Sequence, residues 1–331
     1  MELASDDDGA RPGAPTEPDV KRLPLLLALV TAGCRARALP ESQLFPAGTP
    51  FVARYVEIEG TRIRYVDGGG HGVPVIFLHG LGASMYAWRK NLPAVAAAGF
   101  RVIAYDNRGF GLSDKPAGPY DNASLAGLTI GLMDSLRLPE AVLIGHSMGG
   151  AIAAEVAIDY PARVRGLVLI GSAGLGAREA ALLRVARWPL IGPFVLAFRG
   201  RRLTARILKS TYADPTKVTE ADVDQYYAPV AEPQYARALG GVLRQFRVDG
   251  LAGRLDHVAA PTLVLWGEQD RIVPVGLGRA MATEISRSAF LTVQRAGHAV
   301  QEEAPDEVNR LVVKFLREGL PRIPADLAFG R

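Results

Sequence analysis

A serine between two glycines, at the end of an apolar run, is the clearest chemical feature of the chain. Residues 141–144 are apolar and short, as in a buried strand, and Gly145-His146-Ser147-Met148-Gly149 follows directly. Small and apolar residues then continue to Tyr160, which predicts a helix. Strand, G-x-S-x-G and helix in this order predict a sharp turn that exposes the Ser147 hydroxyl as a nucleophile. The Met148 amide then lies at a helix N-terminus, where it can stabilise an oxyanion.

A serine hydroxyl is a weak nucleophile until a base accepts its proton, so a histidine and an orienting carboxylate are expected. Two histidines follow Ser147 in the sequence, His257 and His298. His298 comes just after an apolar run, and parallel sheets hold their sites at the carboxyl ends of strands. His257 precedes a predicted strand, so it falls at the opposite edge and is interpreted as a surface or hinge residue. We therefore predict that His298 is the general base.

The orienting carboxylate is predicted to be Asp270. It lies in Gly267-Glu268-Gln269-Asp270, directly beyond the predicted strand 262–266. Glu268 is the near rival, but it comes too soon after the strand. Asp106 precedes the serine and lies in a glycine-rich loop, where capping a turn is its expected role.

A second oxyanion donor is expected from the loop that follows the predicted strand 75–78. There His79-Gly80-Leu81-Gly82 offers the amide of Leu81, and glycines let the backbone come close to a substrate. His79 precedes the serine, so we interpret it as a structural partner of this loop. The predicted oxyanion hole therefore consists of the Leu81 and Met148 amides.

Alternating strand and helix patterns must position these residues. A hairpin is predicted from residues 54–58 and 62–66, which flank Glu59-Gly60-Thr61. Several of the following strands are apolar throughout, which predicts a mostly parallel sheet with helices on both faces. The predicted strands are 75–78, 101–105, 141–144, 166–170, 262–266 and 289–294, and the predicted helices are 85–97, 122–136, 148–160, 275–285 and 305–316.

Residues 172–255 interrupt this alternation, because they carry helical periodicity without a convincing strand. We expect them to form a helical cap, inserted between the two parts of the core at residues 51–171 and 256–320. An apolar stretch at 182–198 is interpreted either as a substrate pocket or as ordinary packing on the core. The basic residues that follow favour a solvated face, or a membrane-facing surface if the chain carries a lipid anchor; they are Arg199, Arg201, Arg202, Arg206 and Lys209.

The two ends of the chain are predicted to lie outside the folded core. Residues 1–20 are acidic and then rich in Pro, Gly and Ala, so we predict disorder, with a linker at 35–50 and a loose tail at 321–331. Lys21-Arg22 precedes an apolar run that ends at Ala32-Gly33-Cys34, which resembles a secretory signal or a lipoprotein site with lipid attachment at Cys34. A packed apolar helix is the alternative. Localisation therefore stays open between the cell envelope, with membrane association through this anchor, and the cytoplasm.

The composition limits the function classes further. A hydrophobic content of 49% and a charged content of 22% predict a sizeable core. The net charge is only +4, with no concentrated basic face interleaved with aromatic residues, so nucleic acid is not an expected partner. One cysteine excludes an intramolecular disulfide and a cysteine-rich metal site. No metal or cofactor is implied, and the expected partner is a small-molecule ester.

With these motifs in place, residues 51–318 resemble an α/β-hydrolase fold enzyme with a helical cap. Five motifs carry the resemblance, each at its expected strand end; they are His79 to Gly82, Asp106 to Asp114, Gly145 to Gly150, Gly267 to Pro274, and Gly297-His298. The resemblance implies the chain order nucleophile, acid and histidine, hence Ser147, Asp270 and His298, with the Leu81 and Met148 amides as the oxyanion hole. These are the residues identified above.

Serine at this turn argues against relatives that are haloalkane dehalogenases or epoxide hydrolases, which use aspartate there. We expect acyl transfer to water through an acyl-enzyme, in a carboxylesterase or lipase acting on small to medium apolar acyl groups. The alternative is a carbon–carbon bond hydrolase of ring-cleavage products. Those enzymes are similar in the Ser-Met-Gly-Gly stretch but usually have Asn where this chain has His146. A serine haloperoxidase-like enzyme and an inactive ligand-binding protein on the same fold are further alternatives.

Overall fold

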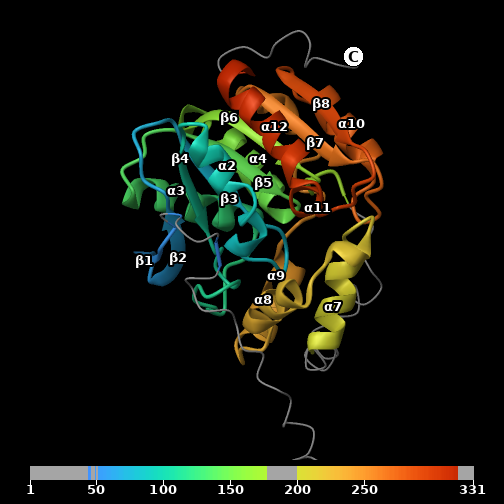
Figure 1. The fold of residues 1–331 in the computed structure, drawn as a ribbon. Coiled ribbons are helices and arrows are strands. Elements are labelled where there is room, and N and C mark those ends of the chain that lie inside the picture. The colour runs from blue at the N-terminus through green and yellow to red at the C-terminus, as the bar shows by residue number, and fades with distance from the viewer. Residues whose placement is uncertain (1–43, 46–48, 50, 177–199, 320–331) are drawn as a thin grey trace, which may run out of the picture. The chain divides into compact units, whose positions relative to one another are not determined.

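The computed structural model describes residues 44–45, 49, 51–176 and 200–319 (Figure 1), all within the compact unit Ala36–Arg331. Several predictions lie outside the described residues. They concern the disordered residues 1–20, the signal-like segment with Cys34, most of the linker, the apolar stretch 182–198 and the tail 321–331.

One sheet is formed by the strands of the described chain, in the order β1-β2-β4-β3-β5-β6-β7-β8. The predicted hairpin is confirmed, since β1 (Ala53–Ile58) pairs antiparallel with β2 (Thr61–Asp67), which in turn pairs antiparallel with β4 (Arg101–Tyr105). All remaining pairings are parallel. They involve β3 (Pro74–Leu78), β5 (Ala141–His146), β6 (Val164–Ile170), β7 (Thr262–Gly267) and β8 (Ser288–Val293). The mostly parallel sheet expected from the sequence is therefore confirmed.

Helices cover both faces of this sheet. Successive side chains of a strand point to opposite faces, so neighbouring residues of one strand pack against different helices. On β3, Val75 and Phe77 pack in one apolar cluster with residues of α2 (Leu92–Ala97) and α12 (Pro305–Lys314). Ile76 and Leu78 pack in the other cluster, with α3 (Asn122–Ser135), α4 (Met148–Asp159) and α10 (Val275–Glu284). The central strands are buried on both sides, which explains their continuous apolar sequences.

The helix predicted over residues 85–97 is wrong as a single element. The chain forms a short 3₁₀ helix, η3 (Met85–Trp88), and then α2, which begins at Leu92. Pro93 lies in the first turn of α2, where it has no N–H to donate to a carbonyl of the preceding turn. The helix therefore starts anew instead of continuing from Trp88. Four short elements complete the core: η4 (Pro161–Arg163), η6 (Leu255–His257), α11 (Val300–Glu303) and the π-type turn η7 (Phe315–Gly319).

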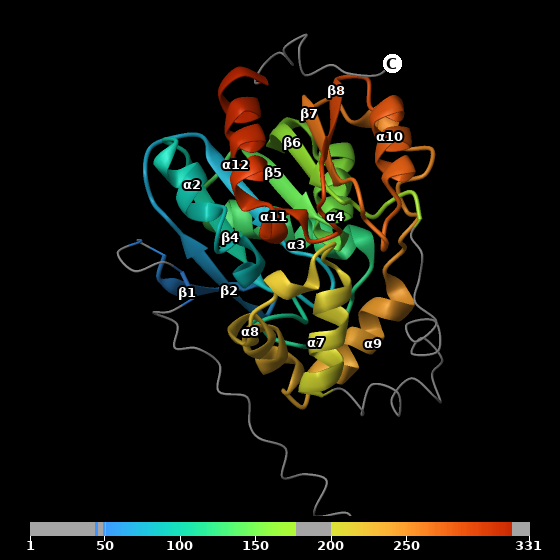
Figure 2. The ribbon, with the colours of Figure 1, turned by 45° about the vertical axis from the view of Figure 1, so that its right-hand side comes forward.

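Between β6 and β7 the described chain at residues 200–255 contains no strand, and we refer to this stretch as the helical insertion. It contains α7 (Arg201–Ser210), η5 (Pro215–Lys217), α8 (Glu220–Val230) and α9 (Tyr235–Gln245). Figures 1 and 2 both show its α-helices side by side beyond one end of the sheet. That end carries the loops after the strands: the Asp222 carboxylate accepts a hydrogen bond from Tyr86 after β3, and the Ala299 amide after β8 donates to Thr211.

Of the basic residues named in the sequence analysis, Arg201, Arg202, Arg206 and Lys209 lie on α7, and Arg199 lies outside the described residues. Arg201 pairs with Glu220 at 2.7 Å and with Asp224 at 2.6 Å, both on α8, whereas Arg202 and Arg206 are exposed. No helix in the described ranges has the length and apolar character needed to cross a membrane.

Candidate active site

Ser147 occupies a strained turn between β5 and α4. Its φ of 54° and ψ of −118° lie in a region that residues other than glycine rarely adopt. The turn is held from β6, since the Ser147 amide donates to the Ile170 carbonyl at 3.0 Å and the Ser147 carbonyl accepts from the Ala173 amide at 3.0 Å. A side chain at Gly145 or Gly149 would collide with the backbone of the neighbouring turn or of β3. These contacts explain why the sequence needs glycine on both sides of the serine.

Asp270 and His298 are brought together from two different loops. Asp270 follows β7 and His298 follows β8, and the carboxylate Oδ2 lies 2.8 Å from the imidazole Nδ1. The other carboxylate oxygen, Oδ1, accepts the backbone N–H groups of Ile272 at 2.8 Å and Val273 at 2.9 Å. Both side chains are buried. Because Nδ1–H donates to Asp270, Nε2 keeps the lone pair that a general base requires.

His146 places the His298 loop beside the serine. The two imidazole rings lie 4.8 Å apart between centroids, and Nε2–H of His146 donates to the His298 carbonyl at 3.0 Å. Burial lowers the pKa of His146 well below its usual value, so the ring stays neutral. In the sequence His146 stood out only as a position where ring-cleavage hydrolases usually have Asn. A histidine that ends a fully apolar strand is the signal that marks such a buried polar contact.

The Leu81 amide belongs to the loop after β3, and the Met148 amide begins α4 directly after Ser147. Neither the Leu81 nor the Met148 N–H finds a hydrogen-bond acceptor among the residues that the structure describes. The loop that holds Leu81 comes close to Ser147, since a Cβ on Gly80 would lie 3.1 Å from the Ser147 Cβ. Ser147 is partly exposed. These are the two amides that the sequence analysis predicts as the oxyanion hole.

His79 holds this loop in place, as the sequence predicts. Its Nδ1–H donates to the Gly80 carbonyl at 2.9 Å, and its Nε2 accepts the Asn107 N–H at 2.9 Å. Burial lowers its pKa, which agrees with a neutral ring that donates with one nitrogen and accepts with the other.

The rival residues take no part in this arrangement. His257 is exposed and pairs with the adjacent Asp256, and Glu268 is exposed. Asp106 is buried, but its carboxylate accepts the backbone N–H groups of Met85 at 2.8 Å and Leu112 at 2.9 Å. It therefore fixes the loop after β4, in line with the capping role expected of it.

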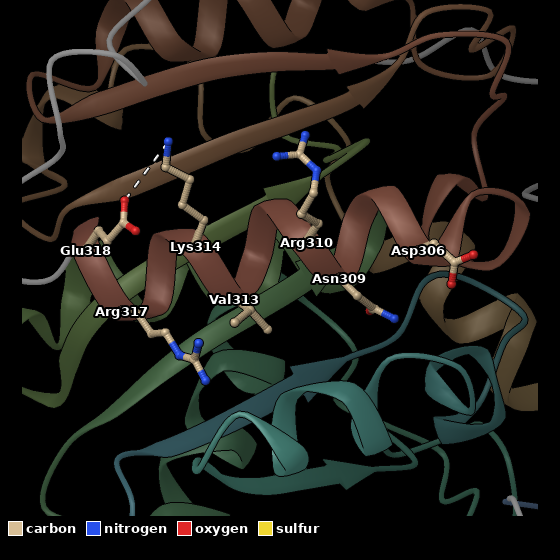
Figure 3. A pocket seen from close by; sticks show the side chains of 7 residues that line it. All are labelled: Asp306, Asn309, Arg310, Val313, Lys314, Arg317 and Glu318. Carbon is tan, nitrogen blue, oxygen red and sulfur yellow. Dashed lines mark ion pairs between the residues drawn. The ribbon is translucent and has the colours of Figure 1, made fainter.

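A separate surface depression runs along α12 and the turn that follows it (Figure 3). Its lining residues are Asp306, Asn309, Arg310, Val313, Lys314, Arg317 and Glu318. It offers no serine, cysteine or histidine, so we do not place the chemistry there. Within the described ranges, no group of three His, Cys, Asp or Glu side chains is arranged to hold a metal ion.

Known proteins resemble this chain over most of its length. Its sequence is 33% identical over 264 residues to the 2-hydroxy-6-oxo-6-phenylhexa-2,4-dienoate hydrolase of Comamonas testosteroni, covering 75% of this chain and 89% of that enzyme. The solved structure of a meta-cleavage product hydrolase from Pseudomonas fluorescens IP01 is similar, with a TM-score of 0.70 and 29% identity over 80% of this chain and 97% of that one. A membrane phospholipase A described as a bacterial virulence factor has a TM-score of 0.69 and 25% identity, covering 89% and 91%.

A family model agrees with these similarities and with the motifs. Residues 73–305 match the model described as alpha/beta hydrolase fold, which spans both parts of the core and the segment between them. The expected fold is therefore confirmed, and the chain belongs to the α/β-hydrolase fold family.

Proposed function

We propose that this protein is a serine hydrolase that cleaves a carbon–carbon bond next to a ketone in a 2-hydroxy-6-oxo-dienoate. The observation that carries the serine mechanism is the 2.8 Å contact of Asp270 with His298, on a loop that His146 holds beside Ser147. The named substrate of the Comamonas testosteroni relative supports the bond type. The relatives thus fit the carbon–carbon alternative better than the carboxylesterase that the sequence led us to expect first.

In the first step, Ser147 Oγ attacks the C6 ketone while His298 Nε2 accepts the hydroxyl proton. The carbonyl oxygen becomes an oxyanion, which the Leu81 and Met148 N–H groups stabilise. Asp270 keeps Nδ1 of His298 protonated and stabilises the imidazolium that forms. The role of Asp270 uses the contact described above, and those of Leu81 and Met148 use N–H groups that have no acceptor among the described residues.

The second step breaks the C5–C6 bond of the substrate in its 2-oxo tautomer. The bonding electrons pass to C5 and are delocalised through the C3–C4 double bond onto the C2 oxygen, so the carbon leaving group is an enolate. It takes up the proton that His298 Nε2 accepted from Ser147, which gives a 2-hydroxydienoate and leaves His298 neutral. The acyl group stays on Ser147 as an ester, and water hydrolyses it with His298 as base, releasing a carboxylic acid.

We infer that the helical insertion acts as the cap that selects the substrate. It contacts the loops after β3 and β8, which hold Leu81 and His298. It also contacts the segment after β4, where Gln245 on α9 accepts the Tyr120 N–H at 2.8 Å. A substrate bound at Ser147 would therefore lie against the insertion.

Product analysis with the purified protein tests this proposal. Incubation with 2-hydroxy-6-oxo-6-phenylhexa-2,4-dienoate should yield benzoate and 2-hydroxypenta-2,4-dienoate in equal amounts, measured by chromatography. The Ser147→Ala variant is the control and should yield neither product. Wild-type protein that forms no benzoate would contradict the assignment of this bond.

Ester hydrolysis is the second candidate, favoured by the similarity to the phospholipase. Both reactions pass through an acyl-enzyme on Ser147, so relative rates on the two kinds of substrate decide which activity is the main one. A series of p-nitrophenyl esters of rising chain length supplies the comparison. If kcat/KM for the preferred ester exceeds that for the dienoate by more than tenfold, the enzyme is an esterase instead.

A further inference from the structure

We propose that Glu303 is a positioning residue that ties the His298 loop to the helical insertion. Glu303 ends α11, five positions after His298, and is 4% exposed. Its Oε2 accepts the Gly297 N–H at 2.7 Å and the Ala213 N–H at 3.0 Å, and its Oε1 accepts the Asp214 N–H at 2.8 Å. One carboxylate therefore bridges the residue before His298 and the segment that joins α7 to α8.

A second set of contacts joins the same two segments on the other side of His298. The Ala299 N–H donates to the Thr211 carbonyl at 3.0 Å. A Cβ on Gly297 would lie 2.6 Å from the Ala213 nitrogen and 2.7 Å from the Thr211 oxygen, so only glycine permits this approach. Both neighbours of His298 are thus fixed to residues 211–214. His298 cannot move away from the insertion without breaking these hydrogen bonds.

The chemistry of Glu303 explains why a carboxylate is needed here. Three N–H donors converge on two oxygens, and burial of a carboxylate is tolerated only where such charge-assisted hydrogen bonds replace water. A glutamine has one acceptor oxygen, so its amide group must face at least one of these N–H groups. Alanine removes all three bonds. The Glu303→Gln and Glu303→Ala variants therefore form a graded series.

Glu302 provides a matched control from the same helix. It is 2% exposed, but its carboxylate contacts the Arg89 guanidinium and the Tyr226 hydroxyl, each at 2.5 Å. Neither partner belongs to the His298 loop. Glu302→Ala should therefore lower thermal stability about as much as Glu303→Ala while leaving His298 in place.

The inference rests on the proposed serine-hydrolase function, because it assigns Glu303 a role through His298. Small displacements of a catalytic group cost about 100-fold in rate. We expect Glu303→Ala to lower kcat by about 100-fold with KM changed less than about threefold, and Glu303→Gln to fall between this variant and wild type. The rate of Ser147 labelling by a fluorophosphonate should fall in parallel, since it needs the base but not the substrate.

Three outcomes separate the inference from the function on which it rests. The inference is supported if Glu303→Ala lowers kcat and the rate of Ser147 labelling, while Glu302→Ala keeps kcat and labelling rate within about threefold of wild type at a similar fall in melting temperature. The inference is overturned if the two alanine variants lose the same fraction of kcat, or if Glu303→Ala keeps the wild-type kcat. Wild-type protein that neither hydrolyses a substrate nor reacts with the fluorophosphonate refutes the proposed function itself. If Glu303→Ala fails to fold, the same comparison is made between Glu303→Gln and Glu302→Gln.

Discussion

Replacing Asp270 by asparagine should inactivate the enzyme while leaving its fold intact. The Ile272 and Val273 N–H groups both point at Oδ1, so they fix the orientation of the new amide with its oxygen toward them. The amide NH₂ group then takes the place of Oδ2, which lies 2.8 Å from His298 Nδ1. Nδ1 must become the acceptor, and the proton moves to Nε2, the nitrogen that should accept the Ser147 proton.

The magnitude follows from this change of tautomer. In the serine protease triad, the same substitution lowers kcat by about 10⁴, with the geometry preserved. At about 1.36 kcal/mol for each factor of ten, the transition state here should be destabilised by about 5.4 kcal/mol. Stability should change little, because both backbone N–H groups keep their acceptor oxygen.

The assay compares kcat of Asp270→Asn with that of Asp106→Asn at pH 7.5. Asp106 is also buried and accepts two backbone N–H groups, and its carboxylate pairs with Arg64. The control should therefore keep kcat within about tenfold of wild type, since it removes no group from the reaction. The reasoning is refuted if Asp270→Asn retains more than about 1% of wild-type kcat, or if both variants lose the same fraction.

Two further predictions concern stability. Burial lowers the pKa of His146, so the folded protein keeps this ring neutral while the unfolded chain protonates it below about pH 6.5. The free energy of unfolding therefore decreases as the pH is lowered. In urea titrations, His146→Asn should reduce the decrease between pH 6.5 and 5.5 by about 1 kcal/mol, and an unchanged decrease would contradict this. Arg89 forms buried ion pairs with Asp222 and Glu302. Arg89→Met leaves both carboxylates without this cation, so the free energy of unfolding in urea titrations should fall by about 3–5 kcal/mol. A decrease below about 1 kcal/mol would show that the ion pairs contribute little to stability.

The sheet and its hairpin could be predicted because each strand shows its own local pattern. The turn at Ser147 needs glycines at fixed positions, and a single sequence shows where these glycines are. The contact between Asp270 and His298 could be predicted because the carboxyl ends of parallel strands meet at one edge of a sheet. Strand β7 and strand β8 are neighbours, and their following loops therefore approach each other.

Contacts between segments far apart in the chain could not be predicted from local sequence patterns. His146 and Glu303 each bond to the backbone of another segment. A histidine at the end of an apolar strand indicates a buried polar contact, but the sequence does not show which backbone group is the partner. The break between η3 and α2 was missed because the apolar periodicity of residues 85–97 continues across it, although Pro93 marks it. Substrate choice is harder still, since it depends on how the helical insertion packs over the site, and packing of helices is set by three-dimensional shape.

The central claim is that Ser147 is the nucleophile of a hydrolytic site. Mass spectrometry of the protein after reaction with a fluorophosphonate, followed by peptide mapping, tests it most directly. We predict one adduct per chain, located on Ser147, with loss of hydrolysis in proportion to labelling and no adduct in the Ser147→Ala variant. Labelling of another serine, or full activity of the chain labelled at Ser147, would contradict the account.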